Sequence, residues 1–78
     1  MDDKALMVEA MITIENLEIG RIFTVKSLFP GHRWEELTAG ECRAFGGIFK
    51  RAYQNGDIPS ITYIGKAQNN SAQYKKEG

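Results

Sequence analysis

Basic and amide side chains recur along one side of a helical pattern that spans residues 39–54. The four positions stand roughly one turn apart and opposite the apolar side chains, and they are Arg43, Lys50, Arg51 and Gln54. Arginine can donate two hydrogen bonds to guanine, glutamine can pair with adenine, and lysine can neutralise a phosphate. The spacing is therefore typical of a helix that contacts double-stranded DNA, although a solvated basic surface would contain the same residue types.

A second group of polar side chains lies between residues 66 and 76, where the pattern changes from helical to alternating. It combines amides and hydroxyls with lysines, which suit phosphate oxygens and the minor groove. An exposed turn followed by a frayed tail is the competing interpretation. The predicted DNA-binding residues of the whole chain are Arg43, Lys50, Arg51, Gln54, Lys66, Asn69, Asn70, Lys75 and Lys76.

Side chains that could support catalysis or metal binding are scarce. His32 is the only histidine and Cys42 the only cysteine, whereas a metal site needs several such ligands. The Gly46-Gly47 pair lacks the Lys-Ser/Thr sequel of a phosphate-binding loop. A nucleophilic Cys–His pair is conceivable, but a domain this small offers little pocket, and Cys42 suits the apolar face of the helix. We therefore expect no enzymatic activity, no metal and no cofactor.

The chain has 78 residues, 42% hydrophobic and 26% charged, which is the size and composition of one globular domain over residues 1–78. No segment approaches the ~20 apolar residues of a membrane span. The first residues are acidic rather than basic, which argues against a secretory signal. A single cysteine excludes an internal disulfide and favours a reducing compartment. These features predict a cytoplasmic protein that does not associate with membranes.

The formal net charge is zero, but the charges are unevenly distributed along the chain. Residues 1–20 carry five acidic and one basic side chain, whereas residues 21–78 carry nine basic and five acidic ones. An acidic segment before a basic body is compatible with nucleic-acid binding. Dedicated DNA-binding domains are usually more basic, so the charge balance leaves a protein partner open as well.

The helix over residues 39–54 is predicted from its cap, its apolar face and its C-terminal stop. Thr38 and Glu41 stand three apart, as in a capping box, and Asn55-Gly56 ends the pattern. The apolar face consists of Cys42, Phe45, Ile48, Phe49, Ala52 and Tyr53. We expect Phe45 and Phe49 to lie in the core.

Two consecutive glycines, Gly46 and Gly47, fall inside this helix. Each costs roughly 0.8–1 kcal/mol relative to alanine in a helix interior. The pair therefore predicts that something approaches the backbone closely. The domain's own packing is the first expectation, DNA or a partner helix is the second, and a break in the helix is the alternative.

The C-terminal segment predicts a β-hairpin over residues 60–76. Apolar and polar residues alternate in its two strands, and Gln68-Asn69-Asn70 supplies the turn. Before the long helix, residues 21–25 predict a short strand. Thr24 can cap a short helix over 25–29, which Pro30-Gly31 would stop.

The remaining segments are less constrained by pattern. Residues 34–37 can form a further turn, with Trp34 in the core or half-buried because of its large area. Residues 1–17 combine helical and strand-like spacing of apolar side chains. The pattern favours a helix over residues 3–11 and leaves residues 12–17 open.

Together these elements predict a small α+β domain of the winged-helix type, with the order helix, short strand, short helix, long helix and β-hairpin. Residues 39–54 would be the recognition helix and residues 60–76 the wing. The strand at 21–24 would complete a small sheet with the hairpin. The linker from Pro30 to Leu37 is longer than the three or four residues of a simple helix-turn-helix.

A Gly-x-x-Phe-Thr-x-Lys-x-Leu-Phe motif, followed by a tryptophan, a Gly-Glu pair and a second glycine, resembles a family of small uncharacterised bacterial proteins. These proteins occur mainly in Firmicutes and their mobile elements. The matching positions are Gly20, Phe23, Thr24, Lys26, Leu28, Phe29, Trp34, Gly40, Glu41, Gly47 and Lys66. The chain is more loosely similar to small winged-helix DNA-binding proteins of plasmids and phages. The resemblance spans residues 17–76 and implies a fold but no catalytic role.

Three functional hypotheses follow from these features. The first is binding of double-stranded DNA, in transcription control or in processing of mobile-element DNA. The second is a protein-binding module, such as a phage or plasmid protein that blocks or recruits a host protein. The third is a homodimer in which residues 1–17 pair between protomers.

Overall fold

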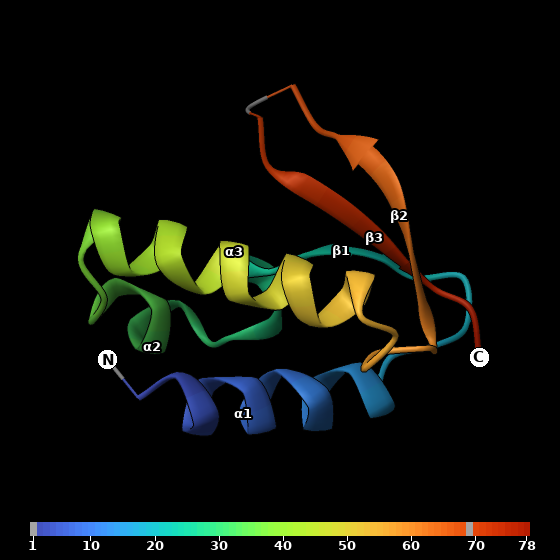
Figure 1. Ribbon diagram of the computed structural model, residues 1–78, viewed down its shortest axis with the longest axis horizontal. Helices are drawn as coiled ribbons and strands as arrows, with labels where there is room; N and C mark the ends of the chain where they lie inside the picture. The colour runs from blue at the N-terminus through green and yellow to red at the C-terminus, as the bar shows by residue number, and fades with distance from the viewer. Residues whose placement is uncertain (1, 69) are drawn as a thin grey trace.

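The computed structural model describes residues 2–68 and 70–78, and that part of the chain contains three α-helices and a three-stranded antiparallel sheet (Figure 1). The elements, in chain order, are α1 (Asp3–Glu15), β1 (Ile22–Thr24), the 3-10 turn η1 (Lys26–Leu28), α2 (Gly31–Glu35), α3 (Ala39–Gln54), β2 (Ile61–Lys66) and β3 (Ala72–Lys76). This order confirms the predicted α+β fold, a small winged-helix-like domain. None of the helices in the described residues has both the length and the apolar character needed to cross a membrane.

The sheet has the strand order β1-β3-β2, so the early strand β1 completes the hairpin of β2 and β3. Tyr74 on the central strand is opposite Phe23 on one side and Tyr63 on the other. Side chains on paired strands alternate between the two faces, and these three rings share the face toward α3. The predicted contact between an early strand and the hairpin is therefore confirmed.

The core is formed where α3 lies between α1 and the hairpin (Figure 1). Phe45 and Phe49 are fully buried, as predicted from their place on the only apolar face of the helix. Phe49 packs edge-on against Tyr74 with ring centroids 5.1 Å apart, and Phe45 packs against Phe29 at 5.7 Å. Tyr74 also contacts Phe23, Tyr53 and Tyr63, so it links the sheet to α3.

Helix α3 has the predicted bounds because local signals fix both of its ends. The Thr38 hydroxyl accepts the Glu41 N–H at 3.1 Å, and the Glu41 carboxylate accepts the Thr38 N–H at 3.0 Å. Both bonds of the predicted capping box are present. The bond from the Thr38 N–H lowers the pKa of Glu41. After the helix, Gly56 adopts φ +84°, a conformation that favours glycine.

The Pro30-Gly31 pair follows the end of the short helical turn, as predicted, since η1 ends at Leu28 and Phe29 is extended. A further helix, α2, begins directly at Gly31, where the sequence predicted a linker. Pro30 precedes the first turn of α2, and its carbonyl accepts the N–H groups of Arg33 and Trp34 at 3.0 and 3.2 Å. Proline suits a helix start because its fixed φ is already close to helical. Helix α2 therefore fills most of the predicted long linker. Residues 36–38 alone join it to α3, which is the spacing of a helix-turn-helix.

Helix α1 includes the predicted residues 3–11 and continues through residues that the sequence pattern left open. Its inner face buries Leu6, Ala10 and Ile14, which are four residues apart. Asp2 caps the first turn by accepting the Ala5 N–H at 3.1 Å. At the other end, the Lys76 ammonium donates to the Ile14 carbonyl at 2.7 Å. The helical spacing therefore prevails over the strand-like one up to Glu15.

Candidate nucleic-acid interface

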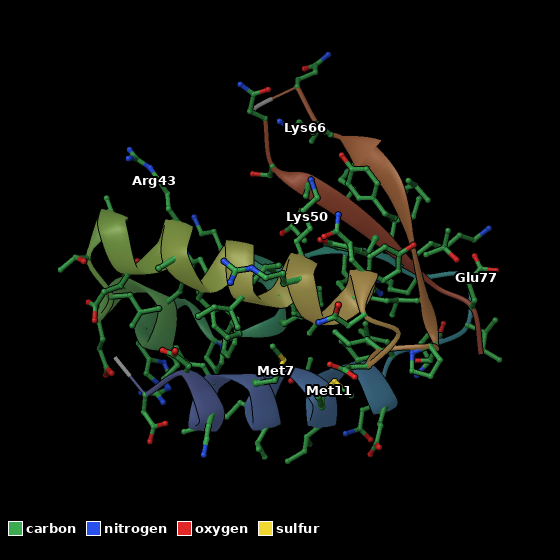
Figure 2. The ribbon with its side chains drawn as sticks, in the orientation of Figure 1. Met7, Met11, Arg43, Lys50, Lys66 and Glu77 are labelled. Carbon is green, nitrogen blue, oxygen red and sulfur yellow. The ribbon has the colours of Figure 1, made fainter. Side chains whose placement is uncertain are left out.

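The outer side of α3 carries the polar residues predicted from the sequence. Each residue of a helix is rotated by about 100° from the one before, so Arg43, Lys50 and Gln54 lie on one side, opposite Phe45 and Phe49. In Figure 2, Arg43 and Lys50 extend from α3 on the side where the hairpin stands. All three side chains are exposed. The predicted helical stripe is thus present, with Arg51 exposed farther round the helix.

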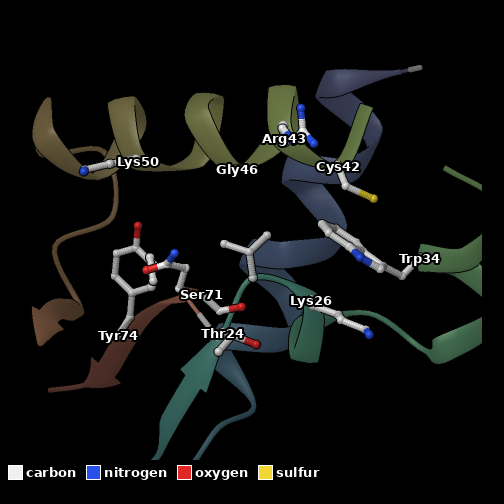
Figure 3. A pocket seen from close by; sticks show the side chains of 12 residues that line it. Thr24, Lys26, Trp34, Cys42, Arg43, Gly46, Lys50, Ser71 and Tyr74 are labelled. Atoms are coloured by element: carbon white, nitrogen blue, oxygen red, sulfur yellow. The ribbon is translucent and has the colours of Figure 1, made fainter. Parts of the chain in front are cut away.

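A groove of about 350 Å³ separates this part of α3 from β1, η1, the hairpin turn and β3 (Figure 3). It is lined by Thr24, Val25, Lys26, Trp34, Cys42, Arg43, Gly46, Lys50, Asn70, Ser71, Ala72 and Tyr74. Three of these side chains are cationic, and no acidic side chain is among the described residues of the lining. A tyrosine phenol is uncharged at neutral pH, and burial raises the pKa of Tyr74 further above its ordinary value. The groove is therefore suited to an anion.

The cations around the groove are not neutralised by neighbouring carboxylates. Within residues 2–68 and 70–78, no ion pair involves Arg43, Lys50, Arg51 or Lys66. The Lys50 ammonium lies 5.5 Å from the centroid of the Tyr63 ring, a cation–π contact that holds it between α3 and β2. These charges therefore remain available to a ligand.

The two glycines of α3 lie at the middle of this surface. The helix continues through Gly46 and Gly47, and a Cβ added at either residue would meet nothing within 4 Å. The first prediction for the pair, close internal packing, and the alternative, a break in the helix, were therefore both wrong. Gly46 lines the groove between Arg43 and Lys50. Two glycines make the helix less stable than two alanines would, and no contact within the described chain explains why glycine is present at these positions.

The wall opposite α3 is formed by residues that were not among the predicted DNA-binding residues. Thr24 and Ser27 are joined by two hydrogen bonds. The Thr24 N–H donates to the Ser27 hydroxyl at 3.0 Å, and the Ser27 N–H donates to the Thr24 hydroxyl at 3.3 Å. This local turn, typical of Ser and Thr, positions η1 and places Lys26 at the groove. Trp34 stacks on Phe29 at 5.5 Å and is half-buried, as expected.

The hairpin brings one of its predicted residues into the groove. Asn70 lines the groove and adopts φ +66° in the hairpin turn. Its backbone N–H donates a hydrogen bond to the Ala67 carbonyl at 3.0 Å. Lys66 lies outside the groove, in a shallow hollow on the wing with Ala67, Gln68 and Gln73. The predicted residue Asn69 lies outside the described part of the chain.

A β-bulge sets the register of the wing. Tyr63 pairs with Tyr74, but the next pairs are Gly65 with Gln73 and Lys66 with Ala72, so Ile64 is an extra residue. Gly65 has φ +118°, which a side-chain-bearing residue would rarely adopt. A lone glycine inside a strand pattern is the sequence signal for such a bulge.

The last two predicted lysines do not join this surface. Lys76 is only 6% exposed and its ammonium caps the C-terminal end of α1 through the Ile14 carbonyl, so its prediction as a DNA contact was wrong. Lys75 is opposite Ile22 and Thr62, on the sheet face away from α3. The structure thus gathers Arg43, Lys50 and Asn70 at the groove and separates both C-terminal lysines from it.

No group of three or more His, Cys, Asp or Glu side chains in the described residues is placed to hold a metal ion. Cys42 is a free, half-buried thiol on the wall of the groove. His32, its only conceivable catalytic partner, is exposed on α2, and no hydrogen bond joins the two side chains among the described residues.

Comparison with known proteins gives a family but no characterised relative. Neither a curated protein nor a solved structure matches the chain. Residues 9–76 match the model of a domain of unknown function, DUF1413. This range includes the helix-turn-helix, both walls of the groove and the whole wing. The chain therefore belongs to the DUF1413 family.

Proposed function

We propose that the protein binds double-stranded DNA through the outer side of α3 and the wing. The observation that supports this most directly is the groove lined by Gly46 and by three cations that form no ion pair with an acidic side chain among residues 2–68 and 70–78. Apart from the two C-terminal lysines, the basic side chains of residues 42–76 are Arg43, Lys50, Arg51 and Lys66, which lie on α3 and the wing, and the only acidic residue of this range is Asp57. Concentrated positive charge on one surface favours binding to a polyanion.

The residues divide by the part of DNA that they would contact. Arg43 lies in the N-terminal half of α3, from which winged and helix-turn-helix proteins most often reach base edges. Lys50 and Arg51 would neutralise phosphates beside the helix, and Lys66 would do so from the wing. Lys26 would add a phosphate contact on the opposite wall of the groove. The two glycines would allow the DNA to approach the helix backbone.

Such a protein would act on DNA in transcription control or in the processing of mobile-element DNA, and it would work in the cytoplasm. Binding at the α3–wing surface needs no cofactor or bond-making step. The proposal therefore concerns recognition rather than catalysis.

Fluorescence anisotropy with labelled random duplex DNA, repeated at several salt concentrations, tests the proposal. About four to five phosphate contacts predict a slope of log affinity against log salt near −4. Replacing Lys50 and Arg51 together with alanine should flatten the slope by up to about two. Arg43→Ala should instead relax sequence preference. Arg21→Ala, at an exposed residue just before β1 and outside the groove lining, is the matched control for loss of one positive charge and should change neither.

A protein-binding module is the second candidate. Two observations favour it: the chain has no net charge, and Ile22 and Ile64 are exposed on the sheet. Isolated exposed apolar residues are common, so this support is weaker. Absence of DNA binding by the parent protein at ~50 mM salt, where phosphate contacts are strong, would overturn the first proposal in favour of the second.

A further inference from the structure

The outer face of α1 is apolar although nothing in the described chain covers it. Val8 and Ile12 are 57% and 54% exposed and stand four residues apart, so they are neighbours on one side of the helix. The inner face is already filled by Leu6, Ala10 and Ile14. An amphipathic helix on a protein surface normally turns polar and charged residues toward water, whereas the centre of this face of α1 exposes two large apolar side chains.

Two charged residues of opposite sign flank this apolar pair. Lys4 precedes Val8 by one turn, and Glu15 follows Ile12 by nearly one turn. With about 100° of rotation per residue, the four side chains fall within an arc of roughly 80°. Both charged side chains are exposed, and neither takes part in an ion pair within residues 2–68 and 70–78. The face is therefore an apolar centre with a positive end and a negative end.

We propose that this face is a homodimer interface in which two α1 helices pack antiparallel around a two-fold axis near Ala10. Symmetry then places Val8 beside the partner's Ile12, and Lys4 beside the partner's Glu15. Lys4 and Glu15 are about 16 Å apart along the helix at 1.5 Å per residue, and the two-fold axis lies about midway between them. A Lys4–Glu15 contact therefore forms at each end of the antiparallel helix pair. A parallel arrangement would set like charges opposite each other, and the charges therefore select the antiparallel one.

The proposed interface leaves the groove accessible. In Figure 1, α1 lies at the edge of the domain opposite the wing, so a partner on its outer face would not reach α3. The two grooves of the dimer would point away from each other. If each groove binds DNA as proposed above, the dimer would hold two duplex segments rather than adjacent sites on one face of a duplex. Dimerisation itself does not rest on that function.

Sedimentation equilibrium of the full chain without nucleic acid tests the proposal. The parent should approach twice the chain mass of 8.8 kDa as its concentration rises. Val8→Glu should abolish dimerisation, because it buries a charge at the centre of the interface. Ile19→Glu is the matched control, since Ile19 is exposed outside α1 and should leave the dimer intact. Circular dichroism confirms that each variant is folded.

A charge exchange tests the orientation of the helices. Lys4→Glu and Glu15→Lys should each weaken the dimer roughly tenfold, because each change makes two symmetric contacts repulsive. The double variant should recover the parent affinity. A parent that stays monomeric at all concentrations, a Val8→Glu protein that still dimerises, or a double variant no better than the single ones would each overturn the proposal. Since DNA is absent, none of these results depends on the groove.

Discussion

On one side of α3, Phe45 and Phe49 are fully buried, whereas on the other side Arg43 and Lys50 carry charges that no carboxylate in the described chain neutralises. The inner side is filled by ring contacts with Phe29 and Tyr74. The outer side is open enough that alanine would fit at both glycines without a contact. The comparison indicates that the inner side supplies the stability of this helix, and that the outer side is free to serve a ligand.

The same contrast separates two lysines of one chain. Lys50 lies on the outer side of α3 and contacts only an aromatic ring among its described interactions. Lys76 is buried and its ammonium holds the last turn of α1. Residue type alone therefore does not assign a lysine to the proposed DNA-binding surface. Variants in each region therefore test the division between side chains that stabilise the fold and side chains that are free to bind a ligand.

The largest expected effect is on the inner side of α3. Phe49→Ala should lower the free energy of unfolding by about 3–5 kcal/mol, because it removes a fully buried ring and leaves a cavity beside Tyr74. Arg51→Ala, two positions away and exposed, should change it by less than about 0.5 kcal/mol. Urea denaturation followed by circular dichroism measures both. Similar losses of unfolding free energy in the two variants would contradict the conclusion that only the inner side of α3 stabilises the domain.

The two C-terminal lysines should differ next. Lys76→Met should lower the free energy of unfolding by about 1.5–3 kcal/mol, because the loss of the buried ammonium donor leaves the Ile14 carbonyl without a hydrogen-bond partner. Lys75→Met, on the exposed face of the sheet, should have little effect. The same denaturation experiment compares them. Equal stability of the two variants would mean that the Lys76 ammonium does not hold α1.

A smaller effect is expected at the start of α3. Thr38→Ala should lower the free energy of unfolding by about 0.5–2 kcal/mol, because the Glu41 N–H loses its acceptor. Thr62→Ala, an exposed threonine on β2, is the control for loss of a hydroxyl away from a cap. Chemical denaturation in which both variants match the parent would contradict the importance of this cap.

The other half of the cap predicts a pH dependence. The pKa of Glu41 is lower in the folded chain than its ordinary value of 4.5, because the carboxylate accepts the Thr38 N–H. Its contribution is therefore complete above the ordinary pKa and is lost as the pH falls through the lowered one. Glu41→Gln should remove this part of the acid sensitivity. Urea midpoints measured from neutral pH to about pH 3 would reveal the difference, and parallel curves for parent and variant would contradict it.

Much of the inner side could be predicted from the sequence because its determinants are local. The spacing of Phe45 and Phe49 and the Thr38–Glu41 box lie within a few residues of each other, and they set the bounds and the buried face of α3. Pro30-Gly31 was correctly predicted to follow the end of the short helical turn, but the helix that begins at Gly31 was not predicted, because proline can end one element and begin another. The winged-helix order remains, although α2 rather than residues 25–29 directly precedes the turn before α3.

The groove could not be predicted in the same way. Its walls come from residues 24–26, 34, 42–50 and 70–74, which only tertiary packing brings together. The burial of Lys76 likewise depends on where α1 ends, and a Lys-Lys pair near a terminus gives no local signal of it. Gly65 did carry a signal, because an isolated glycine in a strand indicates a bulge.

The two glycines of α3 give the sharpest comparison because stability and binding should move in opposite directions. Gly46→Ala and Gly47→Ala should each raise the free energy of unfolding by up to roughly 0.8–1 kcal/mol, since the helix gains a better former and the new Cβ meets nothing within 4 Å. The same methyl groups occupy the space that DNA is proposed to approach, so both variants should bind duplex DNA more weakly. Gly56→Ala is the matched control: its φ of +84° should make that change destabilising, and its place beyond α3 should leave binding unaltered. Denaturation and anisotropy on the same preparations provide both readouts. Full DNA affinity in the Gly46 and Gly47 variants would show that the open backbone is not part of the binding surface.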